Sequence, residues 1–340
     1  MSASATTAAA QEALPTVKTD LVPLLLLPVL ALVAVPLIGS FSTWVTLTFA
    51  GLAMGMIIFI IASGLTLVFG LMDVLNFGHG VFITLGAFLA TTVLGTMVNW
   101  TESERLLLNL LAVLPAILVA MVVVGAVGLV FERVIIRPVY GQPLKQIMIT
   151  MGGMIIGEEL IKVVWGPQAI PLLLPAAFRG SLLFGEAAVE KYRLIAVAIG
   201  LVVFAAMFWV LSRTKIGLLI RAGVQDREMV ESLGYRIRRL FVGVFVVGSA
   251  LAGLGGVLWG LYNQSVTPQM GGQVTVLLFI VIIIGGMGSV GGCFIGSLLV
   301  GLVANYAGFL APKVALFSNI LLMVIVLMWR PEGLYPVGKR

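Results

Sequence analysis

The stretch Gly70-Leu-Met-Asp-Val-Leu-Asn-Phe-Gly-His-Gly80 decides how this chain folds. It lies between two long apolar runs, Trp44–Phe69 and Gly80–Val98. Three polar side chains interrupt the apolar sequence here: Asp73, Asn76 and His79, the single histidine of the chain. Runs of about 20 apolar residues are typical of membrane-spanning helices. The stretch is therefore a break between two such helices, and Gly78 and Gly80 permit an irregular backbone in it.

The composition of the whole chain agrees with a membrane environment. Of 340 residues, 61% are hydrophobic and only 10% are charged, whereas soluble domains carry about 25% charged residues. In lipid, only helices and closed barrels satisfy the backbone. Barrel strands alternate apolar and polar residues, but this sequence has long unbroken apolar runs. We therefore predict an all-α membrane protein, a polytopic helical bundle.

The search for further apolar runs yields ten candidate spans. They are Leu21–Ile38, Trp44–Phe69, Gly80–Val98, Leu106–Phe131, Gln146–Val164, Leu194–Leu211, Leu240–Leu261, Val274–Met287, Gly291–Phe309 and Val314–Met328. The eighth is short for a span and could be a broken or re-entrant element. We expect about ten spans, with eight to ten as the range.

The basic residues predict the orientation of these spans. Lys and Arg gather in the loop Glu132–Lys145, in the loop Ser212–Arg239 and in the tail after Met328. The orientation signals include Arg133, Arg137, Arg238 and Arg239. Short basic loops face the cytoplasm, and an even number of spans separates the three segments. The prediction is that both termini are cytoplasmic, and that the loop at residues 102–105 and the segment Gly166–Arg193 lie outside.

The expected domain organisation is simple. Residues 1–20 are rich in Ala, Ser and Thr and are predicted to be a disordered tail. Residues 21–330 form the transmembrane domain, which includes a cytoplasmic segment at 212–239, and residues 331–340 form a cytoplasmic tail. The first run could be a signal-peptide core, but its length and its three prolines favour a retained span.

The break at residues 70–80 has two interpretations. Polar groups inside a membrane are costly unless they face protein or a water-filled cavity, and broken helices often present their ends to solute in transporters. The candidate residues for a translocation path or gate are Asn76, Phe77, His79 and Gly80. The alternative is a cytoplasmic turn with ordinary helix caps, and both remain open.

A second glycine-rich stretch occupies residues 284–296, Ile-Gly-Gly-Met-Gly-Ser-Val-Gly-Gly-Cys-Phe-Ile-Gly. It is not a phosphate-binding loop, because no Lys-Ser or Lys-Thr follows it, and no lysine of the chain has that context. Gly286 and Gly288 join the candidates for the path or gate. Close helix packing with a tight turn is the alternative. The sequence of Gly292–Ile295, Gly-Cys-Phe-Ile, is similar to that of Gly80–Ile83, Gly-Val-Phe-Ile. This similarity is weak evidence of an internal repeat.

The cytoplasmic segment contains a short amphipathic helix at Asp226–Leu233. Met229, Val230 and Leu233 give it an apolar face, Asp226 is a plausible N-cap and Gly234 a C-cap. A helix this short is marginal in water, so it needs a surface to dock on. That surface is either the protein's own helix ends or a groove in a partner. The candidate coupling residues are Arg221, Asp226, Glu228, Met229, Leu233 and Gly234.

The sequence carries no recognisable catalytic set. One cysteine, Cys293, and one histidine cannot form the usual zinc or Cys/His sites. Glu158 and Glu159 lie inside an apolar run, and Lys162, four residues after Glu158, could pair with it. Intramembrane carboxylates suggest function by default, but a position near the end of the span would make them unremarkable. We expect no enzyme activity and no cofactor.

Three groups of motifs carry a family resemblance. They are Gly64–Gly70 running into Val74–Gly80, Arg221–Asp226 followed by Leu233-Gly234, and Leu251–Leu258 continuing through Gly285–Gly292. In this order they resemble the permease of bacterial high-affinity branched-chain amino acid ABC transporters, in the shorter of its two types. The resemblance covers nearly the whole chain after residue 20. Gly78 stands where a slightly larger small residue is common in the family.

The resemblance implies a set of partners. A second homologous permease would pair with the chain, two cytoplasmic subunits would bind ATP, and a periplasmic binding protein would deliver solute at the bacterial inner membrane. The Asp226–Gly234 helix would contact the ATPase. Members of the family also move urea, short amides and aromatic acids, so the resemblance does not fix the solute.

We therefore expect a permease subunit of an ABC importer that works by alternating access. The alternative is an ATPase-independent secondary transporter or a channel for a small organic solute. A secondary transporter usually needs intramembrane ionisable groups, and the apolar runs contain few.

Overall fold

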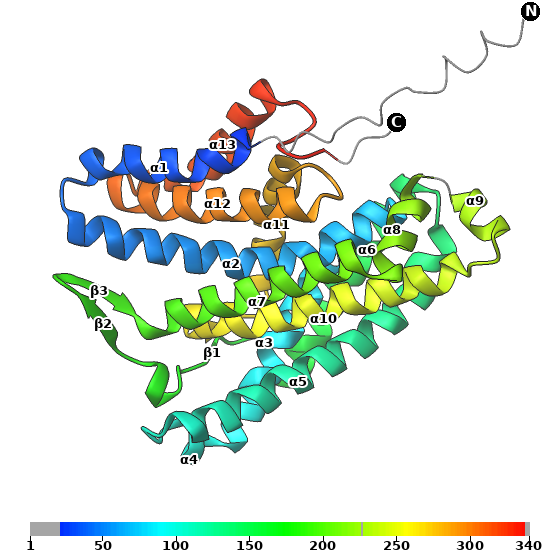
Figure 1. The fold of residues 1–340 in the computed structure, drawn as a ribbon. Coiled ribbons are helices and arrows are strands. Elements are labelled where there is room, and N and C mark those ends of the chain that lie inside the picture. Colours follow the sequence, from blue (N-terminus) through cyan, green and yellow to red (C-terminus); the bar gives the residue numbers. More distant parts are fainter. Residues whose placement is uncertain (1–20, 226, 337–340) are drawn as a thin grey trace, which may run out of the picture.

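The computed structural model describes residues 21–225 and 227–336. The predicted tail at residues 1–20 and the predicted N-cap Asp226 lie outside these residues. Long helices run side by side to form one bundle (Figure 1). Each of the ten predicted apolar runs forms a helix. Their bounds are α1 Val22–Ile38, α2 Phe41–Met72, α3 His79–Thr96, α5 Leu106–Phe131, α6 Pro143–Trp165, α7 Lys191–Arg213, α10 Ile237–Asn263, α11 Met270–Gly285, α12 Val290–Leu310 and α13 Ala315–Trp329.

Several of these helices are long enough to cross a membrane. Within the part of the chain that the structure describes, six qualify by length and apolar composition: α2, α3, α5 with its extension, α7, α10 and α12. The helices α1, α11 and α13 are apolar but shorter. A π-helical turn at Glu132–Ile136 and a 3-10 turn at Arg137–Val139 extend α5. The chain is thus a multi-pass helical membrane protein.

Helix α2 is the centre of the bundle. It has 32 residues, about 48 Å at 1.5 Å per residue, and residues Ile57–Ala62 are completely buried. Helices α7, α10 and α12 pack around it. Small residues allow these close approaches: a Cβ at Gly64 would overlap the carbonyl oxygen of Gly248 in α10. The apolar run of α2 therefore contacts protein along most of its length rather than lipid.

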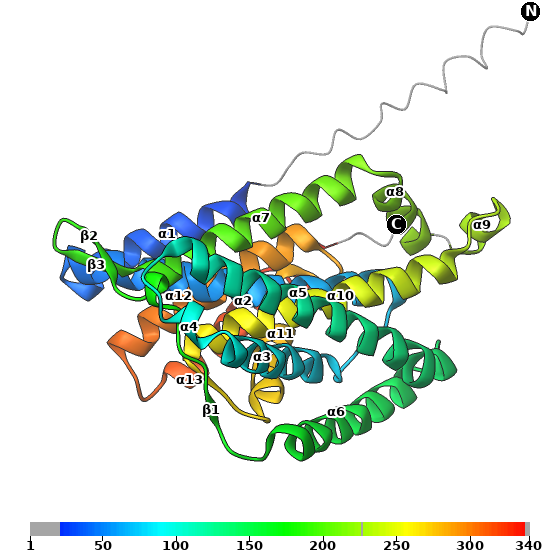
Figure 2. The same cartoon turned by 90° about the horizontal axis from the view of Figure 1, so that it is seen from below.

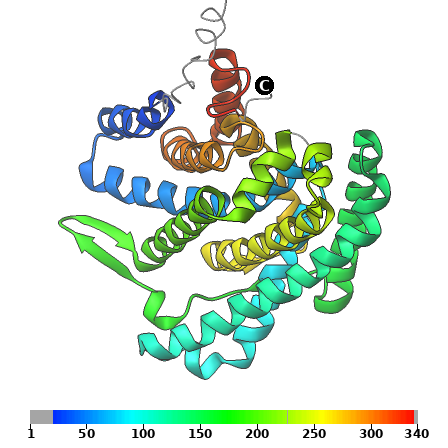
Figure 3. The same cartoon turned by 45° about the vertical axis from the view of Figure 1, so that its right-hand side comes forward.

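The outer helices expose their apolar side chains. Val163 in α6 is 81% exposed and Met328 in α13 is 82% exposed, as expected for a surface that lipid covers. Helix α6 lies at the edge of the bundle (Figure 2). Helices α1, α12 and α13 lie together on another side (Figure 3).

The segment Gly166–Arg193 contains structure that the sequence did not predict. Ile170–Pro171 (β1) pairs antiparallel with Ser265–Val266 (β4), and Ser181–Phe184 (β2) forms a hairpin with Ala187–Glu190 (β3). A 3-10 turn, Ala176–Phe178, precedes the hairpin. The prediction of an all-α fold therefore holds for the bundle but misses two small two-stranded sheets. Strands this short have no sequence periodicity that would reveal them.

The two ends of the bundle differ in structure. The hairpin and the short helix α4 (Val98–Thr101) lie at one end, and the helices α8 (Lys215–Gln225) and α9 (Arg227–Ser232) lie at the other (Figure 1). The sequence predicted a helix only for the α9 region. Thr214 initiates α8, because its Oγ1 accepts a hydrogen bond from the Gly217 N–H at 3.3 Å in the manner of an N-cap.

Candidate functional site: two helix breaks and a surface helix pair

The connection between α2 and α3, residues 73–78, is called break 1. Helix α2 ends at Asp73, which has left-handed backbone geometry (φ 51°) and donates its N–H to the Phe69 carbonyl at 2.9 Å. The His79 Nε2, in the first residue of α3, lies 3.2 Å from the carbonyl oxygen of Ile61. Ile61 precedes the end of α2 by about three turns, or about 16 Å. Break 1 therefore folds back along α2, and α3 starts deep inside the bundle.

Asp73, where break 1 begins, is exposed, but the two polar residues that follow it are buried. Asn76 is 0% exposed and His79 is 1% exposed. Neither polar atom of the Asn76 side chain has a hydrogen-bond partner among the described residues, and such groups are rare in native proteins. Phe77 is half-buried, and its ring lies 4.8 Å from that of Phe279 in α11. Break 1 thus holds a buried amide group that makes no side-chain hydrogen bond to a described residue.

Thr150 in the neighbouring helix α6 forms hydrogen bonds with the backbone of break 1. Its Oγ1 accepts a hydrogen bond from the Phe77 N–H at 3.3 Å and lies 3.5 Å from the Leu75 carbonyl oxygen. The sequence analysis missed this residue. Its signal is the stripe Gln146, Thr150, Gly153 and Gly157 on one helix face, with the polar and small residues that favour close contact between membrane helices.

The connection between α11 and α12, residues 286–289, is called break 2. Gly286 (φ 96°) and Gly288 (φ 83°) have backbone conformations that favour glycine. The Ser289 Oγ accepts a hydrogen bond from the Gly292 N–H at 3.1 Å and caps α12. Break 2 is thus a tight turn in which the glycines provide the geometry.

The end of the chain fastens break 2. The Leu334 N–H donates to the Ile284 carbonyl at 2.8 Å, and the Tyr335 N–H donates to the Gly285 carbonyl at 3.0 Å. Leu334 is 0% exposed. Gly333 and Leu334, which follow the predicted end of the transmembrane domain at residue 330, are buried. No sequence signal identified this contact.

The last turn of α2, just before break 1, lies against break 2. A Cβ at Gly70 would lie 2.7 Å from the Cα of Gly288, so the backbones on either side of the breaks touch. The first turns of α3 and α11 also meet, because the Gly271 N–H donates to the Thr84 Oγ1 at 3.0 Å. A Cβ at Gly80 would lie 2.7 Å from the Thr275 Oγ1. The structure thus brings together the two glycine-rich stretches, which are more than 200 residues apart in the sequence.

An apolar cavity of about 90 Å³ lies between the two breaks. Its walls come from α2, break 1, α11 and break 2. The lining residues are Leu65, Phe69, Val74, Leu75, Phe279, Ile282, Ile283 and Met287. All of these are hydrophobic, so the cavity is suited to an apolar group rather than to a charged one.

The surface helix pair, α8 and α9, contains the predicted coupling residues Arg221, Glu228 and Met229, and Leu233 and Gly234 directly follow α9. The Arg221 Nη1 donates to the Leu211 carbonyl at 2.8 Å and so ties α8 to the end of α7. The predicted apolar face of α9 is divided: Val230 is buried (3% exposed), but Met229 and Leu233 are 56% and 68% exposed. Glu228 is exposed as well. Part of this face is therefore buried against the protein, and part is exposed.

Gly234 ends α9 as the sequence predicted. Its φ is 86°, and its N–H donates to the Glu231 carbonyl at 3.0 Å. The Tyr235 N–H donates to the Val230 carbonyl at 3.3 Å. This pair of bonds around a left-handed glycine is a Schellman-type cap.

The carboxylates of α6 are arranged differently from the prediction. Lys162 was predicted to pair with Glu158, but its Nζ lies 2.6 Å from the Glu159 Oε1. In the described part of the chain, no three His, Cys, Asp or Glu side chains gather as they would around a metal ion. Glu159 is 63% exposed in this pair, which places it on the outer surface of α6.

Fold and site together define a class: a multi-pass helical membrane protein with two breaks between its apolar helices. The family model described as the permease component of branched-chain amino acid transport systems matches residues 47–329. The chain therefore belongs to this family. It is a permease subunit of an ABC importer, and the family is one of transport permeases rather than of enzymes.

Individual relatives agree with this family. The chain is 31% identical over 299 residues to the high-affinity branched-chain amino acid transport system permease protein BraD of Pseudomonas aeruginosa, covering 84% of this chain and 93% of BraD. It is 27% identical over 293 residues to LivH of Escherichia coli, with the same coverage. The match to the E. coli permease LivM covers only 38% of this chain. No solved structure matches the chain.

Proposed function

We propose that break 1 and break 2 together form the gate of the solute path. The observation that carries this proposal is the contact of Gly70, near the end of α2, with Gly288, beside the cavity that both breaks line. Asn76 and Phe77 would act from break 1, His79 and Gly80 from the first turn of α3, and Gly286 and Gly288 from break 2. The first turns of α3 and α11 also meet, and in transporters such half-helices surround the solute.

The chain would cross the bacterial inner membrane about ten times, with both termini in the cytoplasm. The basic residues of two loops support this orientation, because Arg133, Arg137, Arg238 and Arg239 line one common cleft. The helices α8 and α9 lie at one end and the hairpin β2–β3 at the opposite end (Figure 1). A cysteine-accessibility map of single-cysteine variants in intact cells tests this topology.

The chain would work with a second homologous permease, two ATP-binding subunits and a periplasmic solute-binding protein. It would bind no cofactor itself and catalyse no reaction, with ATP bound only by the partners. The exposed Met229 and Leu233 of α9 support an ATPase contact, because apolar side chains at a water-exposed helix favour a groove in a partner. Arg221, Glu228 and Gly234 would position this contact, as would Asp226, which the structure does not describe.

The solute is proposed to be a small amino acid with an apolar side chain. The names of BraD and LivH support this class, and so does the apolar cavity of about 90 Å³ between the breaks. In such a cavity, one additional methylene changes binding by about 1–3 kcal/mol. Competition between leucine, valine and glycine for uptake would test the class of solute.

The alternative is an ATPase-independent secondary transporter or a channel. Reconstitution decides between them: uptake of labelled leucine into proteoliposomes that contain the chain and its partners should require ATP. Transport without ATPase subunits would favour a secondary transporter, and passive flux through the isolated chain would favour a channel.

The coupling role of α9 is tested at Gly234. In Gly234→Val the left-handed backbone is strained, so we expect the cap to open and uptake to fall while membrane insertion stays normal. Gly234→Asn is the matched control, because asparagine tolerates this conformation and should retain uptake. Full uptake by Gly234→Val would contradict the coupling role.

A further inference from the structure

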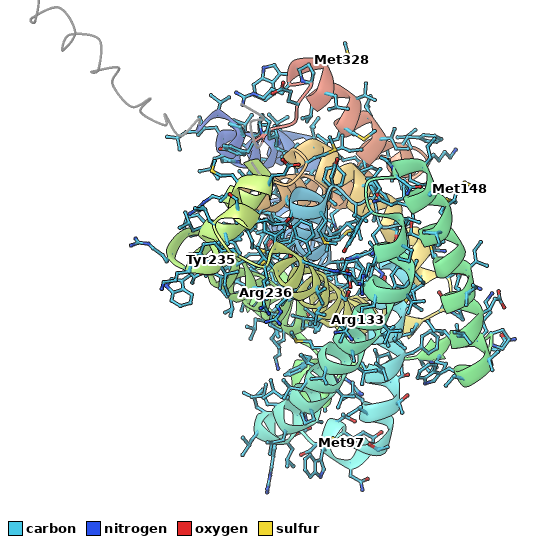
Figure 4. All side chains as sticks on the ribbon, turned by 90° about the vertical axis from the view of Figure 1, so that its right-hand side faces the viewer. Met97, Arg133, Met148, Tyr235, Arg236 and Met328 are labelled. Atoms are coloured by element: carbon cyan, nitrogen blue, oxygen red, sulfur yellow. The ribbon has the colours of Figure 1, made fainter. Side chains whose placement is uncertain are left out.

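A basic cleft lies at the same end of the bundle as α8 and α9. Its volume is about 360 Å³, and we call it the arginine cleft. It lies between the extension of α5 and the first turns of α10. The lining residues are Glu132, Arg133, Arg137, Arg238, Arg239 and Val242. Figure 4 shows Arg133 on the face of the molecule that also carries Tyr235 and Arg236, at the start of α10. The transport mechanism proposed above does not use this cleft.

The charges in the arginine cleft are not balanced. Four guanidinium groups face one carboxylate, that of Glu132, which leaves three positive charges in excess. Glu132 is buried (1% exposed), and its Oε1 accepts a hydrogen bond from the Tyr140 hydroxyl at 2.6 Å. Among residues 21–225 and 227–336, none of the four arginines forms an ion pair. The like charges repel one another unless an anion joins them.

The start of α10 increases this imbalance. Arg238 and Arg239 lie in its first turn, which contains no acidic residue and has no side-chain cap. The N-terminus of a helix carries a partial positive charge, so basic residues are unfavourable there and anions are favourable. An anion in the cleft would therefore be attracted by the arginines and by the helix end together.

Two exposed valines precede the cleft arginines of the α5 extension by three residues each, a spacing that places side chains near one face of a helix. Val130 and Val134, on the α5 side of the cleft, are 60% and 65% exposed. Val242 forms the apolar part of its lining. A free phosphate would use only the arginines, whereas a lipid would use the arginines for its headgroup and the valines for its acyl chains. Basic pockets between membrane helices at the cytoplasmic surface suit anionic headgroups.

We infer that the arginine cleft binds the phosphate headgroup of an anionic phospholipid. The guanidinium groups of Arg133, Arg137, Arg238 and Arg239 bind the phosphate oxygens, with the paired geometry that arginine offers to phosphate. The acyl chains lie along Val130 and Val134. The bound lipid neutralises the basic cluster at the point where the extension of α5 meets α10.

The test is lipid binding by the purified full chain in a zwitterionic detergent. Native mass spectrometry compares phosphatidylglycerol with phosphatidylcholine of the same acyl chains. We expect tighter binding of phosphatidylglycerol, and Arg133→Gln/Arg239→Gln should weaken it about thirtyfold. The control Arg213→Gln/Lys215→Gln removes two exposed positive charges from the same end of the bundle and should leave binding unchanged. Arg133→Lys/Arg239→Lys, which keeps the charge, should retain part of the binding.

Several outcomes would overturn the inference. Equal binding of the two lipids, or equal loss in both double variants, would show only a general surface charge. Complete displacement of phosphatidylglycerol by millimolar inorganic phosphate would show that the acyl chains contribute nothing. A double variant that binds phosphatidylglycerol normally but no longer assembles with the ATPase subunits would assign the cleft to a protein partner. None of these results depends on transport, so the gate proposal is tested separately.

Discussion

Break 1 and break 2 are both interruptions between apolar helices, but they differ in how completely their polar groups are hydrogen-bonded. In break 2 the polar groups are paired: Ser289 caps α12, and Leu334 and Tyr335 donate to the carbonyls of Ile284 and Gly285. In break 1 the buried Asn76 makes no side-chain hydrogen bond to any described residue. Two long contacts with the Thr150 Oγ1, from the Phe77 N–H at 3.3 Å and to the Leu75 carbonyl at 3.5 Å, hold break 1 from the side.

This difference indicates separate roles for the two breaks. A buried amide without hydrogen-bond partners lowers the stability of the folded state by about 1–3 kcal/mol. Unfavourable features of this kind cluster at functional sites, where a second conformation of the protein would pair the amide. Break 2, which is fastened by the end of the chain, is suited to be the fixed side of the gate. Break 1 is suited to be the moving side, since its amide would find partners in another state.

The largest expected effect follows from unfastening break 2. Leu334→Ala leaves a cavity under the turn, and the free energy of unfolding should fall by about 2–5 kcal/mol. Unfolding in mixed micelles measures this change. Leu321→Ala, at a position that is 59% exposed in α13, is the control and should change stability by less than about 0.5 kcal/mol. Equal stability of the two variants would show that the end of the chain does not fasten break 2.

Forcing the two breaks apart should have the next largest effect. Gly70→Leu places a side chain against the backbone of Gly288, which cannot rotate away, and overpacking of this kind costs about 1–3 kcal/mol. Uptake should fall together with the thermal unfolding temperature. Gly152→Leu in α6 is the control, because a Cβ there meets no atom within 4 Å. A fully active and stable Gly70→Leu protein would show that the breaks do not act as one unit.

Asn76→Leu tests whether the unpaired amide is retained for transport. Removing it should leave stability unchanged or raise it by about 1–3 kcal/mol, while uptake falls. Asn109→Leu is the comparison, because this equally buried amide donates to Trp100 and Ser103 and accepts from Ala177, so its loss should destabilise the protein. Normal uptake by Asn76→Leu would remove break 1 from the gate.

The smallest expected effect concerns the contact that holds break 1 from the side. Thr150→Val removes the acceptor for the Phe77 N–H, and the cost should be about 0.5–1.5 kcal/mol. Hydrogen exchange at residues 75–78 should become faster. Thr91→Val is the control, because the Thr91 hydroxyl donates to a carbonyl of its own helix. Unchanged exchange in Thr150→Val would show that α6 does not restrain break 1.

The sequence predicted the helices well, because the backbone hydrogen bonds of a helix form within its own segment of the chain. All ten apolar runs became helices, since a backbone in lipid must make its hydrogen bonds locally. The Gly234 cap was predictable for the same reason, because its geometry depends on neighbouring residues alone. The hairpin β2–β3 was missed, because its strands are too short to distinguish from loops. Helix α8 was missed although its 11 residues carry Ile216, Leu219 and Ile220 at helical spacing.

The candidate site was predicted in part. The glycine-rich stretches were identified from composition, and so were Asn76 and His79 as polar residues in an apolar context. Thr150 and Leu334 were not, because nothing local distinguishes a threonine in an apolar run or a leucine near the end of the chain. The pairing of Lys162 was assigned to Glu158 instead of Glu159, because spacings of three and four residues are nearly equivalent on a helix.

The sequence by itself determined that the chain is a helical membrane protein with two interrupted stretches, and its motifs indicated the family. Only the tertiary structure decided that these stretches touch, that Leu334 and Tyr335 fasten one of them, and that the buried Asn76 side chain has no partner among the described residues. The physical reason is the range of the interactions. Hydrophobicity and helix formation act within about 20 residues, whereas the contact of Gly70 with Gly288 depends on how α2 and α12 pack.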